Sequence, residues 1–312
     1  MSLIEQAAQR LEQLRQAGVD IPSSSAEMDS ESNVEQKAPP PERPEKSLSP
    51  VKPVEQTSIQ SPEMAMSRRV ELDLDALSAA GIVRPDAPRS QLADEYRVVK
   101  RPLIGNAMSK GAVKIKDGNL IMITSALPGE GKTFTAANLA MSIAMELDHT
   151  VMLVDADVAR STLLKVLGLP QARGLLDVLV DESIGLPQVL LRTNVDKLTI
   201  LPSGTPHPRA TELLASDAMI RLLEEMASRY ADRIIIFDSP PLLVTTEARA
   251  LASHMGQVVI VVKADSTSHA DVKHALATID ACPLKLMLLN QVNTSAKDGY
   301  GYGYGYGYGS ST

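Results

Sequence analysis

Residues 119–133 read Asn-Leu-Ile-Met-Ile-Thr-Ser-Ala-Leu-Pro-Gly-Glu-Gly-Lys-Thr, and the rest of the chain is organised around them. Leu120 to Ile123 form a continuous apolar run, as expected for a strand that is buried on both faces of a sheet. Two glycines allow the following loop to curl tightly, and residues 134–147 have the pattern of a helix. A strand, such a loop and a helix in this order surround an anion with N–H groups, so the stretch predicts a phosphate site.

The predicted phosphate loop ends in an intact Gly-Lys-Thr. Lys132 would reach the β- and γ-phosphates of a nucleotide, and the Thr133 hydroxyl would bind Mg²⁺. The usual first glycine of the pattern G-x-x-x-x-G-K-[ST] is replaced by Ala126. The alternative interpretation is an ordinary glycine turn before a helix. The residues expected to bind the nucleotide here are Pro128, Gly129, Glu130, Gly131, Lys132, Thr133 and Phe134.

Composition narrows the classes of protein. A length of 312 residues allows one large domain, or a domain with appendages. A formal charge of −7 and a pI near 5.4 argue against nucleic acid as the main partner. The single cysteine, Cys282, cannot form an internal disulfide, which suits a reducing cytosol. No run approaches the length of a membrane span, so we expect a cytoplasmic protein that reaches a membrane only through a partner.

The chain before the phosphate loop divides into two appendages. Residues 1–18 have the pattern of a short amphipathic helix. Its polar face mixes acids and bases, which favours a protein partner over an anionic bilayer; the alternative is a helix folded back on its own domain. Residues 19–89 are rich in Pro and Ser, so we expect a disordered linker, with a docked segment around residues 72–77 as an option. The catalytic domain is expected over residues 90–293.

A charged helix is expected at the start of this domain. Asp94, Arg97 and Lys100 are spaced to share one helix face before Pro102 interrupts the helix. The alternative interpretation is a solvated charged face.

After the phosphate loop, short apolar runs alternate with helical stretches. The runs are expected as strands at 151–154, 198–201, 233–237, 257–263 and 284–290, with helices near 211–229, 246–254 and 268–280. This alternation predicts an α/β fold of the Rossmann-like P-loop NTPase class, with a mostly parallel sheet covered by helices on both faces. Ligands of such folds bind beyond the carboxyl ends of the strands.

Acidic residues follow two of these predicted strands. Asp155 and Asp157 come just after one strand, and Asp238 follows another. Side chains two residues apart point the same way if the strand continues, so both can face the phosphate loop. Carboxylates converging beside Lys132 would repel one another without a cation, so the arrangement predicts Mg²⁺. The alternative for any single aspartate is a helix cap or a turn.

The chain ends in a tail, residues 294–312, in which Gly and Tyr alternate. Alternating glycine disfavours a stable helix, so we expect the tail to be flexible and accessible. The 18 residues from Asn290 to Tyr308 span at most roughly 60 Å at about 3.3 Å each, enough to enter a neighbouring subunit's site. The alternative is a low-complexity tail without chemistry. The five tail tyrosines are Tyr300, Tyr302, Tyr304, Tyr306 and Tyr308.

Four features together resemble the bacterial tyrosine kinases of exopolysaccharide synthesis. They are the loop at 125–133, Leu-Val-Asp-Ala-Asp at 153–157, Phe-Asp-Ser-Pro-Pro at 237–241 and the terminal tyrosines. The first three correspond to the family's Walker A, A′ and B motifs, and the resemblance covers about residues 90–312. Within the family, the chain is most similar to the soluble tyrosine autokinases associated with exosortase and PEP-CTERM polysaccharide loci, because of Asp-Ala-Asp-Val-Ala-Arg at 155–160 and the opening helix.

The resemblance implies a kinase that uses ATP and Mg²⁺ to phosphorylate its own tail tyrosines, in trans. Lys132 would hold the phosphates, Thr133, Asp155 and Asp238 would organise Mg²⁺, and Asp157 would support the metal. Asp155 could also accept the proton of the incoming phenol. Asn290 would bind the adenine. The family's Asp-x-Asp-x-Arg pattern has Ala159 in the arginine slot, so no role is transferred to Arg160.

The resemblance also implies partners. Asp94, Arg97 and Lys100 are a conservative version of the family's Glu-x-x-Arg-x-x-Arg helix, which implies self-association into a ring or a lower oligomer. A membrane polysaccharide co-polymerase, acting as a chain-length regulator, would activate the kinase and hold it at the inner membrane, and a tyrosine phosphatase would reverse its action. No nucleic acid partner is implied.

Two other functions are compatible with a nucleotide-binding fold. A partitioning ATPase of the ParA or MinD type would carry an additional lysine where this chain has Leu127. A nucleotide-dependent scaffold of a polysaccharide export complex would bind ATP without transferring phosphate to tyrosine.

Overall fold

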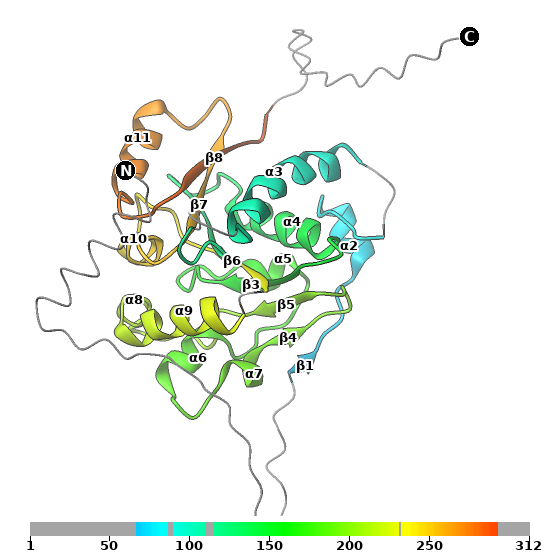
Figure 1. The fold of residues 1–312 in the computed structure, drawn as a ribbon, viewed down its shortest axis with the longest axis vertical. Coiled ribbons are helices and arrows are strands. Elements are labelled where there is room, and N and C mark those ends of the chain that lie inside the picture. Colours follow the sequence, from blue (N-terminus) through cyan, green and yellow to red (C-terminus); the bar gives the residue numbers. More distant parts are fainter. Residues whose placement is uncertain (1–66, 87–89, 110–114, 231, 293–312) are drawn as a thin grey trace, which may run out of the picture. The chain divides into compact units, whose positions relative to one another are not determined.

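The centre of the fold is an eight-stranded sheet, seen in a computed structural model that describes residues 67–86, 90–109, 115–230 and 232–292 (Figure 1). The strand order is β1-β4-β5-β3-β6-β2-β7-β8. Neighbouring strands run parallel except β4 and β5, which are antiparallel. The strands are β1 (Arg68–Arg69), β2 (Leu120–Ser125), β3 (Thr150–Asp155), β4 (Leu191–Arg192), β5 (Leu198–Leu201), β6 (Arg233–Asp238), β7 (Gln257–Lys263) and β8 (Lys285–Asn290).

Helices cover both faces of this sheet, which confirms the predicted fold class. The helices are α2 (Leu74–Ala79), α3 (Gln91–Ala107), α4 (Lys132–Ala144), α5 (Leu163–Val166), α6 (Leu175–Val180), α7 (Leu186–Val189), α8 (Ala210–Leu214), α9 (Asp217–Arg229), α10 (Thr246–Ala252) and α11 (His269–Ala277). None of those in the described ranges is long and apolar enough to span a membrane.

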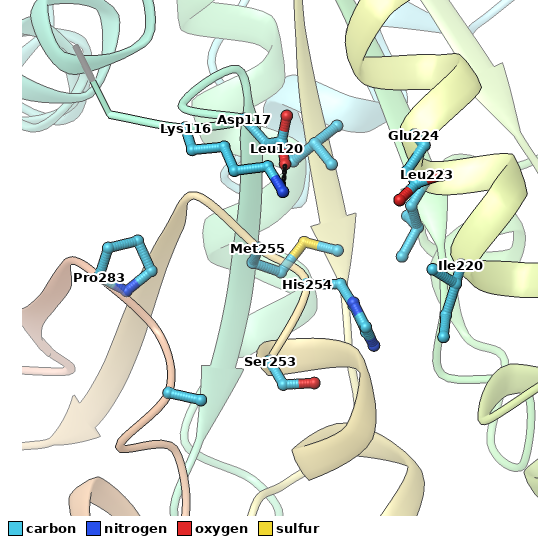
Figure 2. Close-up of a pocket in the computed structure, with 11 residues that line it drawn as sticks. Lys116, Asp117, Leu120, Ile220, Leu223, Glu224, Ser253, His254, Met255 and Pro283 are labelled. Carbon is cyan, nitrogen blue, oxygen red and sulfur yellow. Dashed lines mark ion pairs between the residues drawn. The ribbon is translucent and has the colours of Figure 1, made fainter. Parts of the chain in front are cut away.

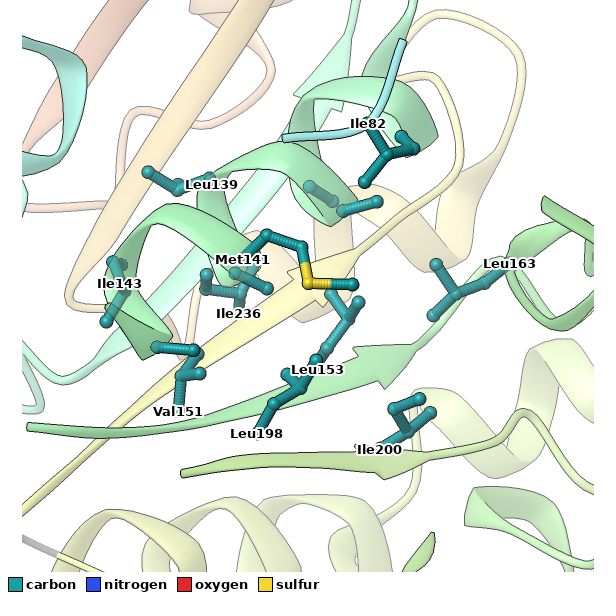
Figure 3. Close-up of a cluster of buried hydrophobic side chains, with 14 of the residues drawn as sticks. Ile82, Leu139, Met141, Ile143, Val151, Leu153, Leu163, Leu198, Ile200 and Ile236 are labelled. Atoms are coloured by element: carbon teal, nitrogen blue, oxygen red, sulfur yellow. The ribbon is translucent and has the colours of Figure 1, made fainter. Parts of the chain in front are cut away.

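The side chains of the central strands alternate between two hydrophobic cores. Ile121, Leu153 and Ile236 point into the core under α2 to α5, where Figure 3 shows Leu153 and Ile236 beside Met141 of α4. Their chain neighbours, among them Met122, point into a second core under α6 to α11. Strands buried on both faces explain the unbroken apolar runs in the sequence.

The last part of the linker expected over residues 19–89 is folded, and it includes the segment around residues 72–77 for which docking was the option. Residues 67–86 include β1, which pairs with β4, and α2. Leu72 and Leu77 are 3% and 4% exposed, respectively. The Val83 N–H donates to Asn138 Oδ1 at 2.8 Å, which ties this segment to α4. A few apolar residues within a polar stretch are enough to dock it.

Helix α3 corrects one further expectation and shows a contact that the sequence did not predict. It runs through Pro102 to Ala107, although an interior proline removes one N–H donor and crowds the carbonyl of the preceding turn; buried Tyr96 and Leu103, on either side of Pro102, hold the helix in place. Lys100 is only 4% exposed, and its ammonium group donates to the Ser142 carbonyl at 2.5 Å and pairs with Glu146 at 2.7 Å. Lys100 therefore joins α3 to α4 within this chain.

The other two residues of the proposed oligomerisation set form a pair on the same helix. Arg97 and Asp94 make an ion pair one turn apart, and both side chains are partly exposed. The predicted N-terminal helix at 1–18, the linker up to residue 66 and the tail at 294–312 lie outside the described residues.

Candidate active site

The phosphate loop lies between β2 and α4, as its sequence suggests. Gly129 has a φ of +82° and Gly131, the residue before α4, has a φ of +97°. Both values belong to the left-handed region that favours glycine. At Gly131 a side chain would also collide, because an added Cβ would lie 2.1 Å from Asn290 Nδ2. The backbone conformation therefore favours glycine at 131, and a side chain there would also displace the Asn290 amide from the loop.

The structure brings Asp155 and Asp238 together. Asp155 is the last residue of β3 and Asp238 the last of β6, and the two are partners in the register of these neighbouring strands. Both side chains are fully buried. β6 lies beside β2 and β3 lies beside β6, so the carboxyl ends that carry the two acids share one edge of the sheet with the phosphate loop at the end of β2.

Asp157 holds the phosphate-loop lysine. Lys132 Nζ lies 2.8 Å from Asp157 Oδ2, and the Arg160 N–H donates to Asp157 Oδ1 at 3.2 Å. The ammonium group is thereby kept over the edge of the sheet where the other two acids lie. A triphosphate would offer this lysine a second, more highly charged partner.

Burial changes the acidity of the paired aspartates. It raises the pKa of Asp155 to about 6, although a 2.7 Å hydrogen bond from the Ser161 hydroxyl opposes the shift. It raises the pKa of Asp238 to about 7, opposed by the charge of Lys132 and by the nearby Thr133 hydroxyl. Buried carboxylates at these values are poised to release protons when a cation arrives.

The same acids fit a magnesium ion. Asp155 Oδ1 and both Asp238 carboxylate oxygens are buried without a hydrogen-bond partner in the described part of the chain. No group of three or more His, Cys, Asp or Glu side chains within the described ranges is arranged to hold a metal on its own. Mg²⁺ commonly uses one or two carboxylates, water and substrate phosphates. Two carboxylates and the Thr133 hydroxyl therefore suit Mg²⁺ that arrives with a nucleotide.

Three hydroxyl residues of the site were missed from the sequence. Ser161 donates to Asp155, the Thr162 hydroxyl lies 3.5 Å from that of Thr133, and Thr267 donates to the Glu130 carboxylate. Ser161 and Thr162 directly follow the Asp-Ala-Asp-Val-Ala-Arg stretch at 155–160, and this position was the available signal. Thr267 belongs to no motif, and only the fold brings it to the loop.

A groove adjoins the phosphate loop between α3 and β8. Its volume is about 630 Å³, and its lining includes Tyr96, Phe134, Leu288, Asn290 and Gln291. The Asn290 side-chain amide donates to the Glu130 carbonyl at 3.0 Å. This groove is mostly apolar with a few polar groups at one end, which suits a flat aromatic base.

Another cavity, of about 310 Å³, lies near the other ends of the strands, opposite the phosphate loop (Figure 2). Its lining includes Leu120 at the start of β2 and Met255 and Pro283, which precede β7 and β8. It is therefore at the amino ends of the parallel strands, away from the phosphate loop. The tail tyrosines lie outside the described residues.

Known proteins with a similar sequence indicate the family to which this domain belongs. A family model described as an AAA domain matches residues 118–291, more than half of the chain. The tyrosine-protein kinase YwqD of Bacillus subtilis is 31% identical over 206 residues, which cover 66% of this chain and 83% of YwqD.

A longer relative and a solved structure extend the comparison. The succinoglycan biosynthesis transport protein ExoP of Rhizobium meliloti is 34% identical over 181 residues, which cover 57% of this chain but only 22% of ExoP. The crystal structure of the VpsO kinase domain is similar with a TM-score of 0.52 and 25% identity, and the match covers 65% of this chain and 100% of that domain.

Proposed function

The chain belongs to the bacterial tyrosine-protein kinases with an AAA domain, and we propose that it uses Mg-ATP to phosphorylate its own tail tyrosines, in trans, and thereby regulates the synthesis or export of an exopolysaccharide. The observation that carries this proposal is the juxtaposition of Lys132 on the phosphate loop with the buried pair of Asp155 and Asp238. Phosphoryl transfer requires mainly positioning and charge stabilisation, which this arrangement can supply.

Each residue has a distinct role in the proposed reaction. Lys132 moves from Asp157 to the β- and γ-phosphates, and the loop N–H groups orient the triphosphate. Thr133, Asp155 and Asp238 hold Mg²⁺, which when bound neutralises charge on the phosphates. Asp157 orients Lys132 before the nucleotide enters.

The transfer step needs a group that accepts a proton. A tyrosine hydroxyl has a pKa of about 10 and is protonated at neutral pH. Asp155, at the same edge of the sheet, would accept that proton as the phenolic oxygen bonds to the γ-phosphorus. The bond between the γ-phosphorus and the bridging oxygen breaks, and ADP leaves with that oxygen.

The adenine base would occupy the groove beside Phe134, with Asn290 at its polar end. The acceptors are the uncharged tail tyrosines, which can approach an acidic site without repulsion. Each phosphate adds roughly −1.5 to −2 charges, so successive phosphorylation would drive the tail out of the site and loosen an assembly.

Partners follow from the family and remain proposals. A membrane polysaccharide co-polymerase would recruit and activate the kinase at the inner membrane, and a tyrosine phosphatase would reset it. Asp94 and Arg97 would contribute to self-association into a ring or a lower oligomer, whereas Lys100 is occupied within its own chain.

The test combines two defective chains. The full chain carrying Lys132→Met cannot transfer phosphate, and a chain ending at Val292 lacks acceptors. Incubation of the two with Mg-ATP should phosphorylate tyrosines of the Lys132→Met chain, as mapped by mass spectrometry over residues 296–312. Each chain alone should give no signal, and Lys165→Met, which removes an exposed lysine on α5, should behave like the wild type.

Two results would count against the proposal. Phosphorylation that is unchanged in the Lys132→Met chain alone would exclude this site. ATP hydrolysis without any phosphotyrosine, even with the co-polymerase supplied, would favour the ATPase switch or the scaffold.

A further inference from the structure

A buried acid lies in the middle of the phosphate loop. Glu130 is only 2% exposed, although it stands between Gly129 and Gly131, where a triphosphate is expected. An unpaired negative charge at this position would be costly to bury and would repel phosphate. The environment of Glu130 must therefore hold its carboxylate in a fixed direction.

Two donors hold that carboxylate. Glu130 Oε2 accepts the Leu127 N–H at 2.7 Å, and Glu130 Oε1 accepts the Thr267 hydroxyl in a short hydrogen bond. The first bond closes the loop on itself. The second ties the loop to a segment that lies 137 residues away in sequence, between β7 and α11.

Thr267 is itself fixed by the turn that contains it. Its N–H donates to the Lys263 carbonyl at 3.1 Å, and its hydroxyl oxygen accepts the Lys263 N–H at 3.2 Å. These bonds leave the hydroxyl hydrogen directed at Glu130. Since Lys263 is the last residue of β7, the orientation of Thr267 is set by the sheet and not by the loop.

We infer that Thr267 is a positioning residue for the nucleotide: acting through Glu130, it fixes the curl of the phosphate loop that binds the β- and γ-phosphates. It has no proposed contact with substrate. Its loss would leave the buried carboxylate with one donor, so Glu130 would turn toward solvent and release the Leu127 N–H. The N–H groups around the phosphates would then lose their common direction.

This inference rests on the nucleotide site of the proposed function and concerns binding rather than transfer. Because the lost hydrogen bond is to a charged group and preorganises the loop, its removal should weaken Mg-ATP binding about tenfold. The KM for ATP should rise in proportion, while kcat at saturating ATP changes less than twofold. A residue with a merely structural role would lower thermal stability without raising the KM for ATP at a nearly unchanged kcat.

The test uses three threonine variants of the full chain. Thr267→Val keeps the shape and removes the hydroxyl, and Thr267→Ser restores it. Thr278→Val is the matched control, because within the described residues its hydroxyl bonds only to the Ala275 carbonyl, at the far end of α11. Isothermal titration with Mg-ATP, well below the unfolding temperature, should give a dissociation constant raised about tenfold for Thr267→Val alone.

A second comparison tests the route through Glu130. Glu130→Gln can no longer accept from both donors, and adding Thr267→Val to it should cause no further loss of affinity. Equal affinity of the wild type and Thr267→Val, or additive losses in the double variant, would overturn the inference. Failure of the wild type to bind Mg-ATP would instead overturn the proposed function itself.

Discussion

Replacing Asp238 with asparagine should stabilise the nucleotide-free protein at high pH while abolishing its kinase activity. Asp238 is fully buried, and neither of its carboxylate oxygens has a hydrogen-bond partner among the described residues. Its charge therefore lowers the stability of the folded chain whenever Mg²⁺ and nucleotide are absent. Asparagine removes that charge with almost no change in shape.

The size and sign of the effect follow from the pKa. Burial raises the pKa of Asp238 from 3.8 to about 7, a difference of about 3 pH units. At 1.36 kcal/mol per unit, the ionised side chain costs roughly 4 kcal/mol of folding free energy above pH 7. Between pH 4 and 7 the folded chain keeps a proton that the unfolded chain releases, so stability falls as pH rises through this window.

Urea unfolding in EDTA at pH 5 and pH 8 measures this effect. An unpaired asparagine amide has its own cost, but that cost is the same at both pH values and cancels in the comparison. Because only the part of the window between pH 5 and pH 7 lies between the two measurements, Asp238→Asn should gain roughly 3 kcal/mol more, relative to the wild type, at pH 8 than at pH 5. Asp196→Asn, at an exposed position, should show no such difference.

Addition of Mg-ATP should reverse the order at pH 8. The wild type gains stability by ligand binding, whereas Asp238→Asn lacks one proposed metal ligand and should gain little. If the stability of Asp238→Asn relative to the wild type were the same at both pH values, the claim that the buried charge of Asp238 destabilises the folded chain would be refuted.

Three shorter predictions test other parts of the structure. Gly131→Ala should weaken Mg-ATP binding by at least about tenfold in calorimetry, because its φ is +97° and the new Cβ would lie 2.1 Å from Asn290 Nδ2. Leu77→Ala should lower the free energy of unfolding in urea by about 2–5 kcal/mol, since its side chain is buried in the core. An unchanged free energy would indicate that this segment is not docked and belongs to the linker predicted over residues 19–89. Lys100→Ala should cost about 1–3 kcal/mol in the same assay, because the buried ammonium bonds within the chain, without altering the oligomeric state seen by light scattering.

The sequence predicted the parts of the fold that depend on local pattern. Strands buried on both faces need unbroken apolar runs, so β2, β3 and β6 were identified close to their observed bounds. Asp155 and Asp238 were predicted to converge because the carboxyl ends of parallel strands share one edge, and the observed register pairs them directly.

The features that were missed depend on tertiary contacts. The two-residue strands β1 and β4 carry no periodic signal, since each is defined by its neighbour. Lys100 has the spacing of an exposed helix face, but the end of α4 packs on it and provides the Ser142 carbonyl. Thr267 reaches the phosphate loop only because β7 lies beside β2 in the sheet.

The electrostatics of the site explain why metal and nucleotide should arrive together. The free site already balances one cation, Lys132, against Asp157, which leaves Asp155 and Asp238 to share any further positive charge. At neutral pH their raised pKa values keep part of that pair protonated, and Mg²⁺ must displace those protons to bind. A triphosphate supplies the remaining ligands and draws Lys132 away from Asp157. Nucleotide binding should therefore tighten as pH rises toward 8, because fewer protons remain to be displaced.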